Sequence, residues 1–190
     1  MAETKDCGMR PMPEAEALYR RWLSHLDDEF KRQQTAERRA EIVRDELYEI
    51  YMGRPLGART STSLISETAM FVLADSLDAR NVAVEADYAC DVDKEKYGPR
   101  KPLIWFWQMF DRSPLGLNLW LGLRFRCMLG HHIFASLGKG VKIYRNVDFT
   151  FGYNVTIEDN CSIQRGVYLD DRAPILLRAG TDVAEGTRVG

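Results

Sequence analysis

The stretch FGYNVTIEDNCSIQRGVYLDD, residues 151–171, repeats a short pattern that has no helical period. A large apolar residue opens each group of six, Gly or Asn stands in the fourth place, and Val or Cys follows in the fifth. Gly and Asn are the residues that most readily adopt a positive φ, so the fourth place is predicted to be a left-handed turn. The first and fifth places are then predicted to point inward.

The same pattern runs through the C-terminal part of the chain. Groups of six begin at Leu137, Ile143, Phe151, Ile157, Ile163, Leu177 and Val183. Their fourth places hold Gly140, Asn146, Asn154, Asn160, Gly166, Gly180 and Gly186. A six-residue period with turn residues is typical of a parallel β-solenoid, in which each short strand stacks on the equivalent strand of the next coil.

A longer period is superimposed on the first, because Leu137, Ile157 and Leu177 are 20 residues apart. Three groups of six make only 18 residues, so each coil is predicted to hold two extra residues at the same corner, near 149–150 and 169–170. Corner insertions in solenoids gather on one face, which is often the binding face.

These repeats resemble the hexapeptide-repeat acyltransferases, and FGYNVTIEDN followed by LDD makes 149–171 similar to the maltose and galactoside O-acetyltransferase branch. The resemblance implies a left-handed parallel β-helix over 137–190 and a homotrimer. It also implies transfer of an acyl group from acetyl-CoA or another acyl-CoA, without a metal, to a hydroxyl or amine of a sugar-like or other small-molecule acceptor. Serine acetyltransferase has a similar layout of helices followed by a β-helix, but layout does not fix function.

In this family a histidine removes the proton from the acceptor hydroxyl. The chain has three histidines, His25, His131 and His132, and none follows 132. The resemblance places the general base about five positions after Val189, which is beyond the last residue. We therefore expect an incomplete β-helix with no catalytic residue of its own, so that whether the chain is an enzyme stays open. The alternative function is a non-catalytic solenoid for assembly, or a truncated inactive relic.

The resemblance also implies substrate-binding residues. Asp171 matches the aspartate that the maltose-type enzymes use on the acceptor, and Asp170 stands beside it. The alternative for Asp171 is a solvated carboxylate at a corner. Where that branch has an N-x-N pair, residues 163–166 read IQRG, which leaves the identity of the acceptor open.

Composition excludes several classes of protein. The net charge is −2 and no basic stripe is present, which argues against a nucleic-acid partner. The four cysteines, Cys7, Cys90, Cys127 and Cys161, have no CxxC spacing, so we predict reduced thiols and a cytoplasmic location without a disulfide framework or zinc site. The N-terminus has no apolar core after a basic segment, and thus no secretory signal is predicted.

The N-terminal part, residues 1–102, is predicted to be a helical region, which makes the chain an α+β protein. Residues 13–52 carry apolar side chains at helical spacing and fit two amphipathic helices. A third helix is expected over about 64–79, capped by the Ser/Thr run 60–63, and 91–102 is expected to be a loop.

Residues 103–136 form an aromatic-rich connecting segment that needs a partner surface. Charged residues interrupt it before an apolar run long enough to span a membrane can form. Three alternatives stay open. The segment packs over the first coil of the solenoid as a cap, lies as an interfacial helix in peripheral contact with a membrane, or forms a subunit contact.

Overall fold

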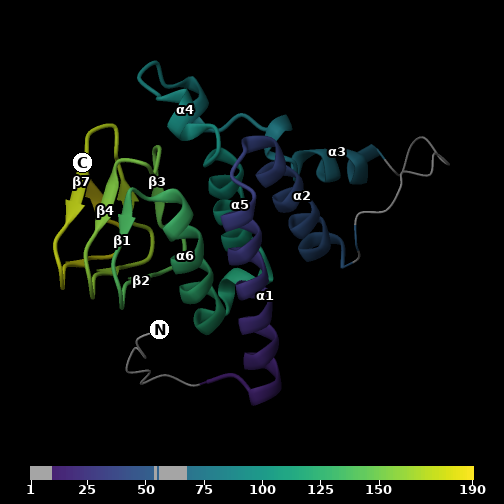
Figure 1. Cartoon of the computed structure of the whole chain (residues 1–190), viewed down its shortest axis with the longest axis horizontal. Coiled ribbons are helices and arrows are strands. Elements are labelled where there is room, and N and C mark those ends of the chain that lie inside the picture. Colours follow the sequence, from purple (N-terminus) through teal and green to yellow (C-terminus); the bar gives the residue numbers. More distant parts are fainter. Residues whose placement is uncertain (1–9, 54, 56–67) are drawn as a thin grey trace.

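The computed structural model describes residues 10–53, 55 and 68–190. A helical N-terminal region is followed by short strands (Figure 1). The helices are α1 (Pro13–Arg32), α2 (Ala36–Met52), α3 (Thr68–Ser76), α4 (Lys94–Tyr97), α5 (Lys101–Arg112) and α6 (Leu119–Ile133). Three short 3₁₀ turns join them in the described residues, η1 (Ala79–Asn81), η2 (Glu85–Tyr88) and η3 (Pro114–Leu117).

Helices α1 and α2 confirm the two helices predicted over 13–52. Thr35 caps α2 by accepting a hydrogen bond from the backbone N–H of Arg38, and Gly53 ends that helix at φ 66°. Helix α3 lies within the range predicted for a third helix, whereas the predicted start and its cap at 60–63 lie outside the described residues.

The loop predicted over 91–102 is wrong, because α4 and the start of α5 lie in it. The carboxylate of Asp93 accepts hydrogen bonds from the backbone N–H groups of Glu95 and Lys96, both at 3.2 Å. An aspartate at this position satisfies the free N–H groups of a first helical turn. Pro102 then lies in the first turn of α5, where a missing N–H group costs nothing.

The C-terminal part, residues 136–190, is called the repeat region. Its strands are β1 (Ser136–Leu137), β2 (Lys142–Ile143), β3 (Asp148–Phe149), β4 (Val155–Ile157), β5 (Ser162–Ile163), β6 (Tyr168–Leu169), β7 (Ile175–Leu177), β8 (Asp182–Val183) and β9 (Arg188–Val189). They pair in parallel into three sheets, β1-β4-β7, β2-β5-β8 and β3-β6-β9. Each strand therefore pairs with the third strand after it, which is a solenoid-like arrangement.

The pairing register confirms the 20-residue period. Leu137 pairs with Ile157, which pairs with Leu177, and the other two sheets keep the same offset. Eleven of the fourteen side chains in the first and fifth places are buried, as predicted, and the other three, Leu137, Thr181 and Thr187, are half-buried. The stacked apolar side chains thus form a continuous core inside the coils.

Positive φ angles mark the corners between strands. Of the seven predicted left-handed positions, six are confirmed, namely Gly140, Asn146, Asn160, Gly166, Gly180 and Gly186. The prediction for Asn154 is wrong, since the positive φ in that corner belongs to Gly152, at 79°. Two additional residues lengthen this corner and shift its turn, which frees the Asn154 side chain to donate a hydrogen bond to the carbonyl of Asp171 at 2.8 Å.

Gly166 provides a direct test of the corner assignment. Its φ is 72°, and an added Cβ would meet only Gly186, at 3.9 Å, so a substitution there tests backbone conformation without a steric clash. Gly166→Val is expected to lower the free energy of unfolding by about 1 to 3 kcal/mol. Gly166→Asn, the residue used at the equivalent place of other corners, is the control and should cost less. Equal melting temperatures for the Val variant and the wild type would contradict the assignment.

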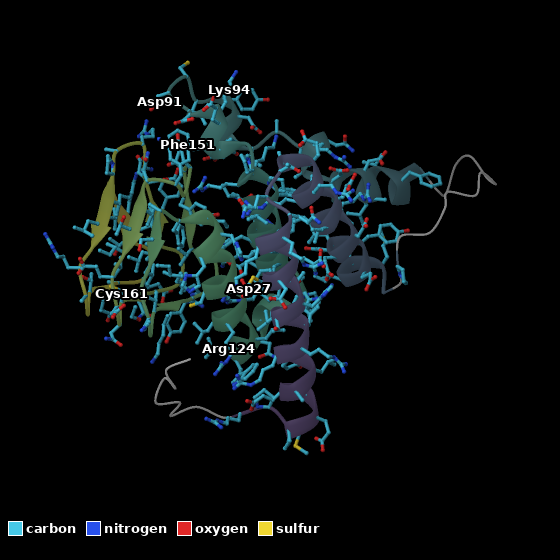
Figure 2. All side chains as sticks on the ribbon, in the orientation of Figure 1. Asp27, Asp91, Lys94, Arg124, Phe151 and Cys161 are labelled. Carbon is cyan, nitrogen blue, oxygen red and sulfur yellow. The ribbon has the colours of Figure 1, made fainter. Side chains whose placement is uncertain are left out.

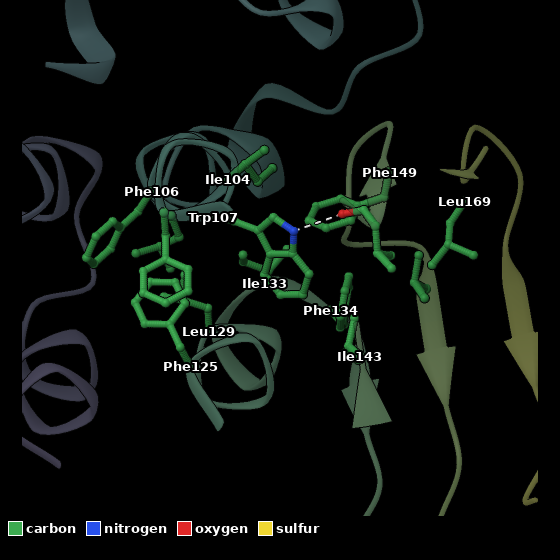
Figure 3. Close-up of a cluster of buried hydrophobic side chains, with 14 of the residues drawn as sticks. Ile104, Phe106, Trp107, Phe125, Leu129, Ile133, Phe134, Ile143, Phe149 and Leu169 are labelled. Carbon is green, nitrogen blue, oxygen red and sulfur yellow. Dashed lines mark hydrogen bonds between the residues drawn. The ribbon is translucent and has the colours of Figure 1, made fainter. Parts of the chain in front are cut away.

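The aromatic segment packs as a cap on the first coil, which was the first of its three alternatives. The indole Nε1 of Trp107 donates a hydrogen bond to the carbonyl of Val147 at 2.8 Å, and its ring meets Phe149 and Phe134 edge to face (Figure 3). One hydrophobic core therefore runs from the helices into the repeat region. Among the described helices, none is both long and apolar enough to cross a membrane.

A buried ion pair lies at the same junction. Arg126 of α6 is 1% exposed and Asp111 of α5 is 5% exposed, and the Nε of Arg126 donates to Oδ1 of Asp111 at 2.8 Å. The second carboxylate oxygen of Asp111 accepts a hydrogen bond from the backbone N–H of Asn146 at 2.7 Å. This carboxylate thus connects two helices to the corner between β2 and β3.

Candidate functional site

The two predicted substrate-binding aspartates occupy different environments. Asp171 is fully buried. Its Oδ1 accepts a hydrogen bond from the backbone N–H of Phe151 at 2.7 Å, and its Oδ2 accepts one from the backbone N–H of Asn154 at 3.2 Å. Burial raises the pKa of the Asp171 carboxyl, and these backbone N–H groups oppose that shift. Asp171 therefore stabilises the corner between β3 and β4, which lies one coil before its own.

The alternative of a solvated corner carboxylate is thus wrong for Asp171, because both of its oxygens are buried against backbone. Its contact with an acceptor stays a prediction. Asp170 lies nearer the surface, where its side chain accepts hydrogen bonds from Arg172 at 2.6 Å and Arg188 at 2.5 Å. The hydrogen bonds from Arg172 and then Arg188 hold the pKa of Asp170 well below its usual range, so this carboxyl is ionised at neutral pH.

A pocket of about 420 Å³ lies beside this corner. It is a partly open cleft lined by residues 83–86, which include the start of η2, by α4 and α5, and by strands β3 and β6. Thr150 and Tyr168 line it, and their hydroxyl groups lie 3.0 Å apart. Thr150 also donates to Oδ1 of Asp170 at 3.4 Å. We call this cavity the corner pocket, since Thr150 connects it to the predicted acceptor site.

The segment that carries α4 contacts the first coil close to this pocket. The backbone N–H of Asp93 donates to the hydroxyl of Tyr153 at 3.0 Å, and the ring of Tyr97 meets Phe151 edge to face. Figure 2 shows Phe151 beside the segment that bears Asp91 and Lys94. The pocket therefore forms where the helical region folds back onto the coils.

Ionisable side chains line the corner pocket on two sides. Asp148 of β3 and Glu85 of η2 contribute carboxylates, and Arg112 of α5 contributes a guanidinium. Burial raises the pKa of Asp148, while a hydrogen bond from the Gln108 side chain at 3.3 Å and the nearby Arg112 oppose the shift. A carboxyl whose pKa is raised in a cleft is a common feature of functional sites.

Two residues that line the corner pocket each carry a buried hydrogen-bond donor without a partner in the described part of the chain, the hydroxyl of Tyr97 and the indole Nε1 of Trp105. Tyr97 is 4% exposed, and burial raises the pKa of its hydroxyl well above the usual range. A buried donor that lacks an acceptor costs roughly 1 to 3 kcal/mol. A ligand that supplies an acceptor to these groups would recover part of this free energy.

Sequence reasoning missed these pocket residues. Tyr97 lies in the segment predicted to be a loop, and Trp105 belongs to the aromatic run predicted to serve packing. Asp148 stands directly before the apolar residue that ends a strand, where an outward carboxylate carries no distinctive signal. These three residues come to line one pocket only because residues 79–97 pass over the repeat region.

The histidines lie away from the corner pocket. His132 of α6 contacts Asp27 of α1, with Nε2 and Oδ1 2.9 Å apart, and its ring packs against the edge of Phe30. Burial lowers the pKa of His132, an effect that the Asp27 hydrogen bond opposes. His131 and His25 are exposed. The geometry gives His132 a packing role between two helices.

Comparison with protein-family models, curated proteins and solved structures finds no match to this chain. Within residues 10–53, 55 and 68–190, no group of three or more His, Cys, Asp or Glu side chains is placed to hold a metal ion. The functional assignment therefore depends on the repeat pattern and on the geometry of the two neighbouring sites.

Proposed function

We propose that the chain belongs to an acyl-CoA-dependent acyltransferase that transfers an acyl group, acetyl in the first instance, to a hydroxyl or amine of a small, sugar-like acceptor. The observation that carries this proposal is the parallel pairing of the repeat region at a 20-residue offset with Gly or Asn at its corners. That arrangement supports the resemblance to hexapeptide-repeat acyltransferases. A left-handed coil, a homotrimer and a cytoplasmic location are parts of the same proposal.

The two aspartates of the corner have different roles in the proposed reaction. Asp170 is ionised and lies near the surface, so it is the better placed of the two aspartates to orient an acceptor hydroxyl. Asp171 acts indirectly, by holding the corner backbone. No histidine stands in residues 137–190, and the resemblance puts the base after Val189. Peripheral membrane contact through 103–136 stays a prediction, and the apolar side chains of α5 and α6 that are buried in the core are not available for it.

Release of thiol from acetyl-CoA, measured with a panel of sugar and amine acceptors, tests this proposal. General-base removal of the acceptor proton contributes about 10² to 10⁴ in rate, so the 190-residue chain is expected to turn over slowly. If the coding sequence continues, the extended chain should be faster by that factor. It should lose this gain when the first histidine after residue 190 is replaced by alanine. Rapid turnover by the 190-residue chain would contradict the position of the base.

A non-catalytic assembly module is the second candidate, and the lack of a histidine in residues 137–190 favours it. The two functions differ in a simple measurement. An assembly module releases no thiol with any acceptor, in the 190-residue chain or in a longer one, yet self-associates at micromolar concentration as judged by light scattering. An acyltransferase binds acyl-CoA saturably, which an assembly module does not do.

A further inference from the structure

Carboxyl groups outnumber guanidinium groups in the lining of the corner pocket. The carboxylates of Asp148 and Glu85 line it together with the guanidinium of Arg112. One nitrogen of that guanidinium already donates to the carbonyl of Gln108 at 2.8 Å. An anionic ligand would be repelled by the two carboxylates, whereas a cationic ligand would be attracted. The formal charges of the lining therefore favour a cation over an anion.

Aromatic side chains make up much of the remaining wall. Tyr97, Trp105, Phe149 and Tyr168 all line the corner pocket. Aromatic rings beside carboxylates are the surroundings in which proteins hold organic ammonium ions. The ring of Tyr168 already attracts one cation in this protein, since the guanidinium of Arg188 lies 4.8 Å from its centre. The lining thus suits a cation with an apolar surface.

The two unpartnered donors add a second requirement. The hydroxyl of Tyr97 and the Nε1 of Trp105 need an acceptor atom, which a simple ammonium ion does not provide. A neutral polyol would provide acceptors but would add no positive charge beside Asp148 and Glu85. A ligand that carries both a positive charge and an oxygen atom meets the two requirements together.

We propose that the corner pocket binds a small organic cation that bears an oxygen acceptor, with its ammonium group toward Asp148 and Glu85 and its oxygen toward Tyr97 and Trp105. A volume of about 420 Å³ lies in the range of ordinary small-molecule sites. This binding involves no chemical step and does not depend on acyl transfer. A failure of this binding proposal would therefore leave the proposed acyl transfer untouched, and the reverse also holds.

Three ligands of similar shape test the charge and the oxygen separately, by calorimetry on the 190-residue chain without acyl-CoA. Choline has a permanent positive charge and a hydroxyl group. Its neutral carbon analogue, 3,3-dimethylbutan-1-ol, lacks the charge, and tetramethylammonium lacks the hydroxyl. We expect choline to bind saturably, the neutral analogue to bind at least about tenfold more weakly, and tetramethylammonium to bind about two- to tenfold more weakly.

Variants of the pocket assign these differences to residues. Tyr97→Phe is expected to weaken choline binding about two- to tenfold and to leave tetramethylammonium binding unchanged, because only choline offers an oxygen to the tyrosine hydroxyl. The same variant should melt at the wild-type temperature or above, since it removes a buried hydroxyl without a partner. Asp148→Asn should weaken the binding of both choline and tetramethylammonium. Tyr88→Phe, a change at a tyrosine that is 80% exposed, is the matched control.

Three outcomes would overturn the proposal. The first is no saturable binding of choline at millimolar concentration by the folded chain. The second is binding of 3,3-dimethylbutan-1-ol as tightly as choline, which would show that charge plays no part. The third is a Tyr97→Phe variant that keeps the wild-type ratio of choline to tetramethylammonium affinity. A lower melting temperature for Tyr97→Phe would contradict the assignment of its hydroxyl as unpartnered.

Discussion

Replacement of Arg126 with methionine is expected to lower the free energy of unfolding by about 3 to 5 kcal/mol. The side chain is 1% exposed and its charge is balanced by Asp111, which is 5% exposed. Methionine fills a similar volume but leaves the carboxylate of Asp111 buried without its cation. The cost of that uncompensated charge, and not the loss of packing, is the reason for the large effect. Urea denaturation followed by circular dichroism measures it.

A second substitution distinguishes this cause from a packing defect. In the double variant Arg126→Met with Asp111→Leu, both charges are gone, and the backbone N–H of Asn146 can turn to water because that residue is exposed. The double variant is therefore expected to be more stable than Arg126→Met alone. Arg165→Met, which breaks an ion pair exposed on both sides, should cost at most about 1 kcal/mol. If the loss of unfolding free energy in the double variant equals the sum of the losses in the two single variants, the electrostatic explanation is contradicted.

Asp171→Asn is expected to lower the free energy of unfolding by about 2 to 4 kcal/mol. The carboxylate of Asp171 accepts hydrogen bonds from the backbone N–H groups of Phe151 and Asn154. An asparagine side chain has one carbonyl oxygen and one NH₂ group, so it leaves one of these N–H groups facing another donor inside the protein. Thermal and urea denaturation of the purified variant measure the loss.

Asp170→Asn is the matched control, since it is the same chemical change at the adjacent residue. The partners of Asp170, Arg172 and Arg188, are exposed and keep their contact with water when the carboxylate is lost. We expect a much smaller loss of stability than for Asp171→Asn. The opposite order of the two variants would show that Asp171 does not hold the corner.

Local backbone preference explains which parts of the fold could be predicted from the sequence. A positive φ is available to Gly and Asn at little cost, so their regular spacing predicted the corners at Gly140 and Asn146 directly. The spacing of Leu137, Ile157 and Leu177 likewise predicted the pairing register. The helical period of residues 13–52 predicted α1 and α2 for the same reason, because the pattern and the structure it describes are both local.

The candidate site could be predicted only in part. The resemblance drew attention to the corner that holds Asp170 and Asp171, but it did not indicate that one carboxylate is fully buried and the other half-buried. Burial there depends on the backbone of the preceding coil, which the pattern of one coil does not contain. The corner pocket was not predicted at all, because Tyr97 and Asp148 come to line one cavity only through the path of the chain between η1 and α5.

The fixed offset between β1, β4 and β7 restricts the ways in which the gene for this protein can change in length. Insertion of one codon within a strand would turn the inward side chains of that strand outward and disturb its pairing with both neighbours. A codon added at the corner after Phe149 or Leu169, where each coil already has its two additional residues, would leave the register of the strands intact. Duplication of 20 codons would add a whole coil whose strands match those before it. Length variation among descendants of this gene is therefore expected to fall at that corner or in whole coils.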